Sequence, residues 1–178
     1  MRFSQTLAAI FLCAAALILP PANNVVAATL PAQKTRAAKA PTPAPHTEIT
    51  KEKIEAIIAT IEEAVKKRNF SAVVPYLAPD FKYKVDGGGQ PTRHANRAQY
   101  ILMMKLSSEV TLDYKYLRKS LTITIAPDGQ SATAHIEAFE MLTLAQGTVA
   151  GDSAGTTTFK IYKGKILISA MEGKVNYV

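Results

Sequence analysis

The segment TKEKIEAIIATIEEAVKKRNFSAVVPYLAPDF, from Thr50 to Phe81, contains an amphipathic helix, a break and the entry into a strand. Thr50 is a good N-cap, and Asn69, a residue type that tolerates the left-handed conformation, can end the helix. Between them, apolar residues recur at helical spacing along one stripe: Ile54, Ile57, Ile58, Ile61 and Val65. We therefore expect the rest of the fold to pack against this stripe.

The residues after the break predict a short second helix and then a strand. A helix over residues 72–77 would carry a proline near its first turn. Phe81, Tyr83 and Val85 then alternate with lysines, which is typical of a strand with one buried face. The glycines at 87–89 predict a turn.

A third helix is predicted to begin at Thr92 and to run to about Leu106. Four apolar residues are expected to form its buried side: Ala98, Ile101, Leu102 and Leu106. From Val110 onward the apolar period changes to two, which indicates strands.

The strands are predicted to follow one another along the chain as hairpins. A change of parity within 117–120 indicates a β-bulge, and residues 127–130 read as a hairpin turn. A long strand over 131–144 is expected, then a glycine-rich loop through Gly155, and a last hairpin of 156–162 with 165–171. Helices followed by antiparallel strands indicate an α+β fold of one domain over residues 49–178.

Two segments precede the predicted domain. Residues 1–28 have the charged start, apolar core and small residues near position 28 that mark a secretory signal peptide. The apolar run from Leu7 to Leu19 is too short to span a bilayer as a helix, so we expect cleavage and no membrane span in the mature chain. Residues 29–48 are rich in Pro and Ala, which favours a flexible linker. The expected location is the periplasm or the outside of the cell.

Composition excludes several kinds of site. The single cysteine, Cys13, lies in the leader, so the mature chain can form no disulfide and no thiolate metal site. His94 and His135 are isolated in the sequence, and we expect no metal and no cofactor. The formal charge of +7 leaves +4 from residue 49 onward, too little and too dispersed for a nucleic-acid-binding face.

The order of elements and several short signatures resemble the NTF2-like superfamily, also called SnoaL-like or cystatin-like α+β barrels. These features are the helix with its Asn69-Phe70 break, the Tyr76-Leu77-Ala78-Pro79-Asp80-Phe81 strand entry, the Asp128-Gly129 turn, and the Lys163-Gly164-Lys165-Ile166 hairpin. The resemblance implies a curved sheet that wraps the first helix as a cone with a pocket inside. It also implies a homodimer formed through the sheet.

Some members of this superfamily are enzymes, and others are binding or assembly modules. The resemblance to ketosteroid isomerase implies an aspartate base on the first strand. Alignment of its Tyr-Ala-Asp-Asp segment with residues 76–80, with one inserted residue, puts Val85 at that position. Asp86 is its neighbour and would point to the opposite face. The resemblance therefore provides no proton-abstracting carboxylate on this strand.

His135 and Glu137 are two residues apart in a predicted strand and so share one face. A histidine beside a carboxylate is suited to proton transfer, with Tyr83 or Tyr114 as a pocket partner. However, the apolar residues between and beside them favour an outward orientation of the pair. The expected pocket residues are the tyrosines at 83, 100 and 114, together with His135.

The sequence favours an exported, non-catalytic domain that binds a small apolar ligand or acts as an envelope assembly and dimerisation module. The alternative is a small lyase or isomerase that uses the His/Glu/Tyr set. The direction in which His135 points distinguishes the two hypotheses. A cone filled by side chains would favour a purely structural interaction domain.

Overall fold

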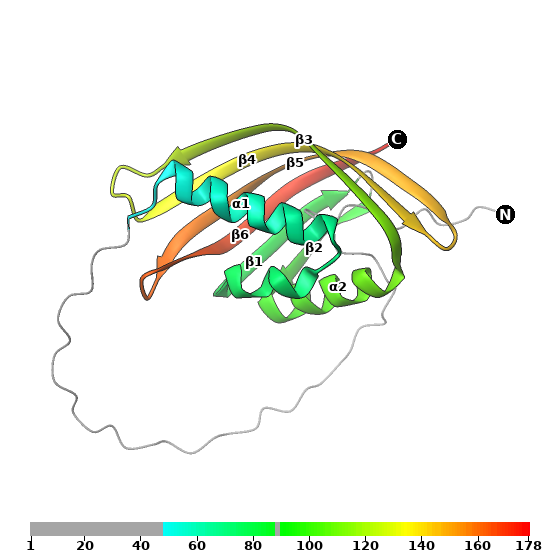
Figure 1. Cartoon of the computed structure of the whole chain (residues 1–178), viewed down its shortest axis with the longest axis horizontal. Helices are drawn as coiled ribbons and strands as arrows, with labels where there is room; N and C mark the ends of the chain where they lie inside the picture. Colours follow the sequence, from blue (N-terminus) through cyan, green and yellow to red (C-terminus); the bar gives the residue numbers. More distant parts are fainter. Residues whose placement is uncertain (1–47, 88–89) are drawn as a thin grey trace, which may run out of the picture.

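The computed structural model describes residues 48–87 and 90–178. The expected signal peptide, and all of the expected linker except Glu48, lie outside the described residues. The described part consists of two α-helices, two short 3₁₀ turns and one six-stranded sheet (Figure 1). The elements in chain order are α1 (Lys51–Lys66), η1 (Phe70–Ala72), η2 (Val74–Tyr76), β1 (Leu77–Gly87), β2 (Gln90–Asn96), α2 (Arg97–Val110), β3 (Thr111–Ile125), β4 (Ser131–Leu144), β5 (Gly147–Tyr162) and β6 (Lys165–Tyr177).

Helix α1 forms as the sequence predicts. The Thr50 side chain accepts a hydrogen bond from the Lys53 amide and caps the first turn. The apolar stripe is buried at Ile54, Ile58, Ile61 and Val65. The helix ends differently from the expectation, because Arg68 rather than Asn69 adopts the left-handed conformation, with φ of 56°. Two successive 3₁₀ turns replace the predicted second helix.

The segment that follows β1 contains the largest difference from the sequence prediction. Residues 90–96 form strand β2, an edge strand paired with β1, where a helix was expected from Thr92. Helix α2 begins only after Asn96, whose side chain accepts from the Gln99 amide while the Gln99 side chain accepts from the Asn96 amide. It buries Tyr100, Met104 and Ser107. The predicted apolar side was wrong at Ala98, which is exposed, and at Leu102, which is 50% exposed, whereas Ile101 packs against the core as expected.

The sheet has the order β2-β1-β6-β5-β4-β3, in which only the β1–β6 pair is parallel. The predicted bulge in 117–120 is confirmed by a register shift between Arg118 and Ser120. Strand β4 has the predicted bounds. The predicted loop before Gly155 was wrong, because β5 is continuous from Gly147 and pairs with β4 along that whole stretch.

The two helices lie against one side of the sheet, which we call the inner face (Figure 1). Alternate residues of each strand point to this face and form the core with the α1 stripe. Val85 is buried there, whereas Asp86 is exposed, as the alternation of β1 predicts. No described helix lies on the opposite, outer face.

Candidate functional site

Aromatic side chains from β1 and α2 meet on the inner face. Tyr100 contacts both Phe81 and Tyr83, with ring centroids 5.0 Å and 4.9 Å apart. Tyr83 and Tyr100 are each 2% exposed. Two of the tyrosines expected in the pocket therefore lie side by side in the interior.

Glu140 is a buried carboxylate on the inner face of β4, only 1% exposed. One carboxylate oxygen accepts a hydrogen bond of 2.7 Å from the Tyr114 hydroxyl, and the other accepts one of 2.6 Å from the Ser153 hydroxyl. Burial, followed by the Glu140 charge, raises the pKa of Tyr114 well above its ordinary value. The phenol therefore stays protonated and acts as a donor.

A second carboxylate reaches the same region from α1. Glu62 accepts hydrogen bonds from the Tyr116 hydroxyl at 3.2 Å and from Arg118 at 3.1 Å. Burial and the Glu62 charge raise the pKa of Tyr116. The ring centroids of Tyr114 and Tyr116 lie 6.5 Å apart, so the residues around Glu140 and those around Glu62 are in contact through these two rings. We call the set the carboxylate–tyrosine cluster; its members are Glu62, Tyr114, Tyr116, Arg118, Glu140 and Ser153.

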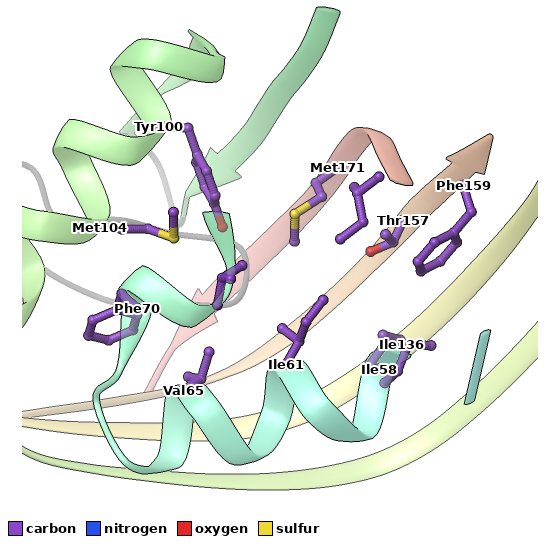
Figure 2. Close-up of a pocket in the computed structure, with 12 residues that line it drawn as sticks. Ile58, Ile61, Val65, Phe70, Tyr100, Met104, Ile136, Thr157, Phe159 and Met171 are labelled. Carbon is purple, nitrogen blue, oxygen red and sulfur yellow. The ribbon is translucent and has the colours of Figure 1, made fainter. Parts of the chain in front are cut away.

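The interior beside this cluster is almost filled. An apolar cavity of about 20 Å³ lies between α1, α2 and the sheet. Figure 2 shows the side chains that line it. A cavity of roughly 10–15 Å³ is the minimum for one water molecule, so this one has no room for a larger ligand. Another cavity of about 10 Å³ lies beside Tyr116 and Ser153. Side chains therefore fill most of the interior around these two cavities.

The structure separates the candidate residues into two groups. Tyr83, Tyr100 and Tyr114 lie in the interior. His135 and Glu137 are exposed on the outer face, where His135 Nδ1 lies 3.3 Å from the Thr156 hydroxyl and Glu137 accepts from Ser120 at 2.9 Å. The sheet thus lies between the His/Glu pair and the three tyrosines, and the predicted His/Glu/Tyr combination does not form.

Sequence reasoning missed Glu140 and Glu62, although each left a signal. On β4, Glu140 occupies the same parity as the buried residues Ala138 and Leu142. Glu62 follows Ile61 at the edge of the α1 stripe. A carboxylate at an apolar position of an amphipathic element indicates a buried, hydrogen-bonded group, because an unpaired buried charge is too costly.

In the described ranges, no three His, Cys, Asp or Glu side chains gather in a way that could hold a metal ion. Neither α1 nor α2 is long and apolar enough to cross a membrane.

Solved structures with the same arrangement of helices and sheet are numerous. An NTF2-like protein of unknown function from Pseudomonas putida KT2440 superposes with a TM-score of 0.54 over 69% of this chain and 84% of that one, at 16% identity. An NTF2-like protein with a cystatin-like fold from Novosphingobium aromaticivorans gives a TM-score of 0.53 over 70% of this chain and 80% of that one, also at 16% identity. The fold is NTF2-like.

The same NTF2-like fold occurs in an enzyme. A type 2 hexachlorocyclohexane dehydrochlorinase matches with a TM-score of 0.57 over 70% of this chain and 83% of that one, at 12% identity. Identities this low establish the fold and leave function to the residues of the site. The sequence matches no protein-family profile and no curated protein.

Proposed function

We propose that this chain is an exported, non-catalytic NTF2-like domain that assembles with a second copy of itself through the outer face of its sheet. The observation that carries the proposal is the contrast between the two faces. On the inner face, α1 and α2 cover the sheet and the cavities described above measure about 20 and 10 Å³, whereas no described helix covers the outer face (Figure 1). The exposed surface of the sheet, rather than its interior, is then the part that can meet a partner.

The centre of the outer face carries small side chains. Thr156 on β5 stands between His135 and Glu172, and the neighbouring outward positions on β5 and β6 hold Ala154, Thr158 and Ala170. These small residues leave a shallow hollow of about 280 Å³ at the centre of the outer face, lined by Ala154, Thr156 and Glu172 among others, into which side chains of a second sheet can pack. This composition supports a sheet-to-sheet contact.

Two pairs of opposite charges lie next to one another on the outer face of β1 and β6. Lys84 is opposite Glu172 on the neighbouring strand, and Asp86 is opposite Lys174. In a two-fold pair the same patch meets itself, so a patch with equal numbers of both signs can be self-complementary. A patch of a single sign would instead repel its copy.

Two apolar side chains lie on the outer face where β3 pairs with β4. Leu117 is 64% exposed and is paired with Phe139 on the neighbouring strand. The Lys119 ammonium lies over the Phe139 ring, 5.9 Å from its centroid. Exposed apolar side chains rimmed by charge are common at protein interfaces. His135 and Glu137 lie on this same face, so in this proposal they are interface residues.

Sedimentation velocity over a dilution series tests the assembly. We expect the wild-type chain to sediment as a dimer that dissociates on dilution, and Thr156→Arg to sediment as a monomer, because a long cation would fill the hollow at the centre of the outer face. Thr60→Arg, at an exposed threonine of α1, is the matched control and should remain dimeric. A wild-type chain that is monomeric at every concentration would contradict the proposal.

A second candidate function is a small lyase or isomerase that works inside the cone. The buried Glu140 carboxylate with its Tyr114 partner favours it, because such a pair can remove and return a proton. The interior side chains would have to move to admit a substrate. Native mass spectrometry of protein purified from its source distinguishes the candidates: a co-purified small molecule that is lost in Glu140→Gln would favour the enzyme.

A further inference from the structure

A groove lies between the 3₁₀ segment and α2, outside the interior and far from the outer face of the sheet. Its volume is about 280 Å³, close to the lower limit of roughly 300 Å³ for small-molecule pockets. The floor is apolar and consists of Phe70, Val74, Ile101 and Met104, and the rim carries Arg68 and Lys105.

The rim of the groove is cationic. Arg68 is held in place by two hydrogen bonds from Nη1, to the Thr111 carbonyl at 2.6 Å and the Leu112 carbonyl at 3.0 Å. A guanidinium carries five N–H donors, and these two hydrogen bonds use only Nη1, so Nε and Nη2 can still donate to an anion. Lys105 is exposed on α2, and no aspartate or glutamate lines the groove within the described residues.

The floor separates the groove from the interior. Phe70 and Met104, 4% and 2% exposed, line both the groove and the interior cavity (Figure 2). Because that cavity measures only about 20 Å³, an apolar chain in the groove has no space to continue past these two residues into the interior. A ligand in the groove therefore stays outside the cone.

We propose that this groove binds a medium-chain fatty carboxylate. The carboxylate lies between Arg68 and Lys105, and the hydrocarbon chain lies on Val74 and Ile101, the floor residues that are only partly buried. Two cations at the rim supply the charge complementarity, and the groove volume of about 280 Å³ limits the size of the ligand. The site shares no residue with the proposed dimer surface and does not depend on it.

Isothermal titration calorimetry of the full-length chain with octanoate tests the site. We expect octanoate to bind at least tenfold more tightly than octanol, which lacks the charge, and than inorganic phosphate, which lacks the tail. Lys105→Glu should weaken octanoate binding at least tenfold. Lys165→Glu, an exposed lysine in the β5–β6 hairpin, makes the same change of net charge and should leave binding unchanged.

A second variant tests the apolar part of the groove. Ser71 is exposed and lines the groove, so Ser71→Trp should fill it and abolish octanoate binding while the circular-dichroism melting curve stays that of the wild type. The proposal is overturned if octanoate does not bind the wild-type chain. It is also overturned if phosphate or octanol binds equally well, or if Lys105→Glu binds octanoate as the wild type does.

Discussion

Tyr114 donates its phenolic hydrogen to Glu140 across 2.7 Å, and both side chains are buried, at 5% and 1% exposure. The two residues are diagonal neighbours on β3 and β4, because Glu140 is directly opposite Tyr116, and both point to the side of the sheet that α1 and α2 cover. A buried carboxylate is tolerated only where donors compensate for lost water, and Tyr114 and Ser153 supply them here. Buried hydrogen bonds therefore stabilise the interior of the cone together with its apolar contacts.

Tyr114→Phe should lower the free energy of unfolding by about 2 kcal/mol, because hydrogen bonds to charged groups contribute about 1.5–3 kcal/mol. Tyr162→Phe is a matched control, since its hydroxyl also donates to a carboxylate, that of Asp80, but at the surface. Surface substitutions change stability by about 0.5 kcal/mol or less. Urea denaturation measures both, and equal losses in the two variants would refute the buried cluster.

The stability of the domain should fall at high pH. The folded-state pKa of Tyr114 is raised, while a tyrosine in the unfolded chain titrates near pH 10. Above about pH 10 the unfolded chain therefore binds fewer protons than the folded chain, and the free energy of unfolding falls by about 1.4 kcal/mol per pH unit for this group. Below about pH 10 the contribution of Tyr114 is complete.

Urea denaturation between pH 9 and 11 measures this dependence. Lysines also titrate in the range, so the comparison with Tyr114→Phe isolates the one phenol. The variant should lose stability less steeply than the wild type above about pH 10. Parallel curves for the two proteins would show that Tyr114 titrates alike in the folded and unfolded chains.

Much of the fold could be predicted because local pattern and tertiary packing agree. Helix α1 has a cap and one apolar stripe, and β4 alternates cleanly from Ser131 to Leu144. Strand β2 could not be predicted, because its sequence QPTRHAN has no apolar alternation and it lies at the sheet edge. The start of β5 was missed because small residues and glycines such as Gly151 mask the period of two.

The candidate site could be predicted only in part. The parity of β4 was enough to indicate that His135 points away from the core. The partners of Glu62, by contrast, lie 54 and 56 residues further along the chain, at Tyr116 and Arg118. Such contacts depend on how β3 bends over α1, and no local pattern specifies that bend.

Ile58→Asp should unfold the domain. Ile58 is 2% exposed and lines the interior cavity, so the substitution places an unpaired charge in the core. Ala59→Asp on the exposed side of α1 is the control, and its cost should be only the lower helix propensity of aspartate, about 0.5 kcal/mol. A normal thermal melting curve for Ile58→Asp would contradict the packing of α1 described above.

Leu117→Glu should weaken dimerisation at least tenfold, because it places a charge in the apolar part of the outer face. Leu102→Glu, at a leucine 50% exposed on α2, makes the same chemical change on the other side of the molecule and should leave the dimer intact. Sedimentation equilibrium gives both dissociation constants. A larger effect of the Leu102 variant would place the interface on α2 instead.

Export of the chain should be visible at its N-terminus. We expect mass spectrometry of secreted or periplasmic material to show a chain that has lost the residues up to about position 28, since the leader has the form of a cleaved signal peptide. Material that retains Met1 would refute the predicted cleavage.

Lysine footprinting tests most directly whether a second copy covers the outer face. Acetylation followed by mass spectrometry should show Lys84 and Lys174, which point outward from β1 and β6, protected in the concentrated wild-type chain relative to Thr156→Arg. Lys51 and Lys105, exposed on the helical side, should react equally in both proteins. Equal reactivity of Lys84 and Lys174 in the two proteins would contradict assembly through this face.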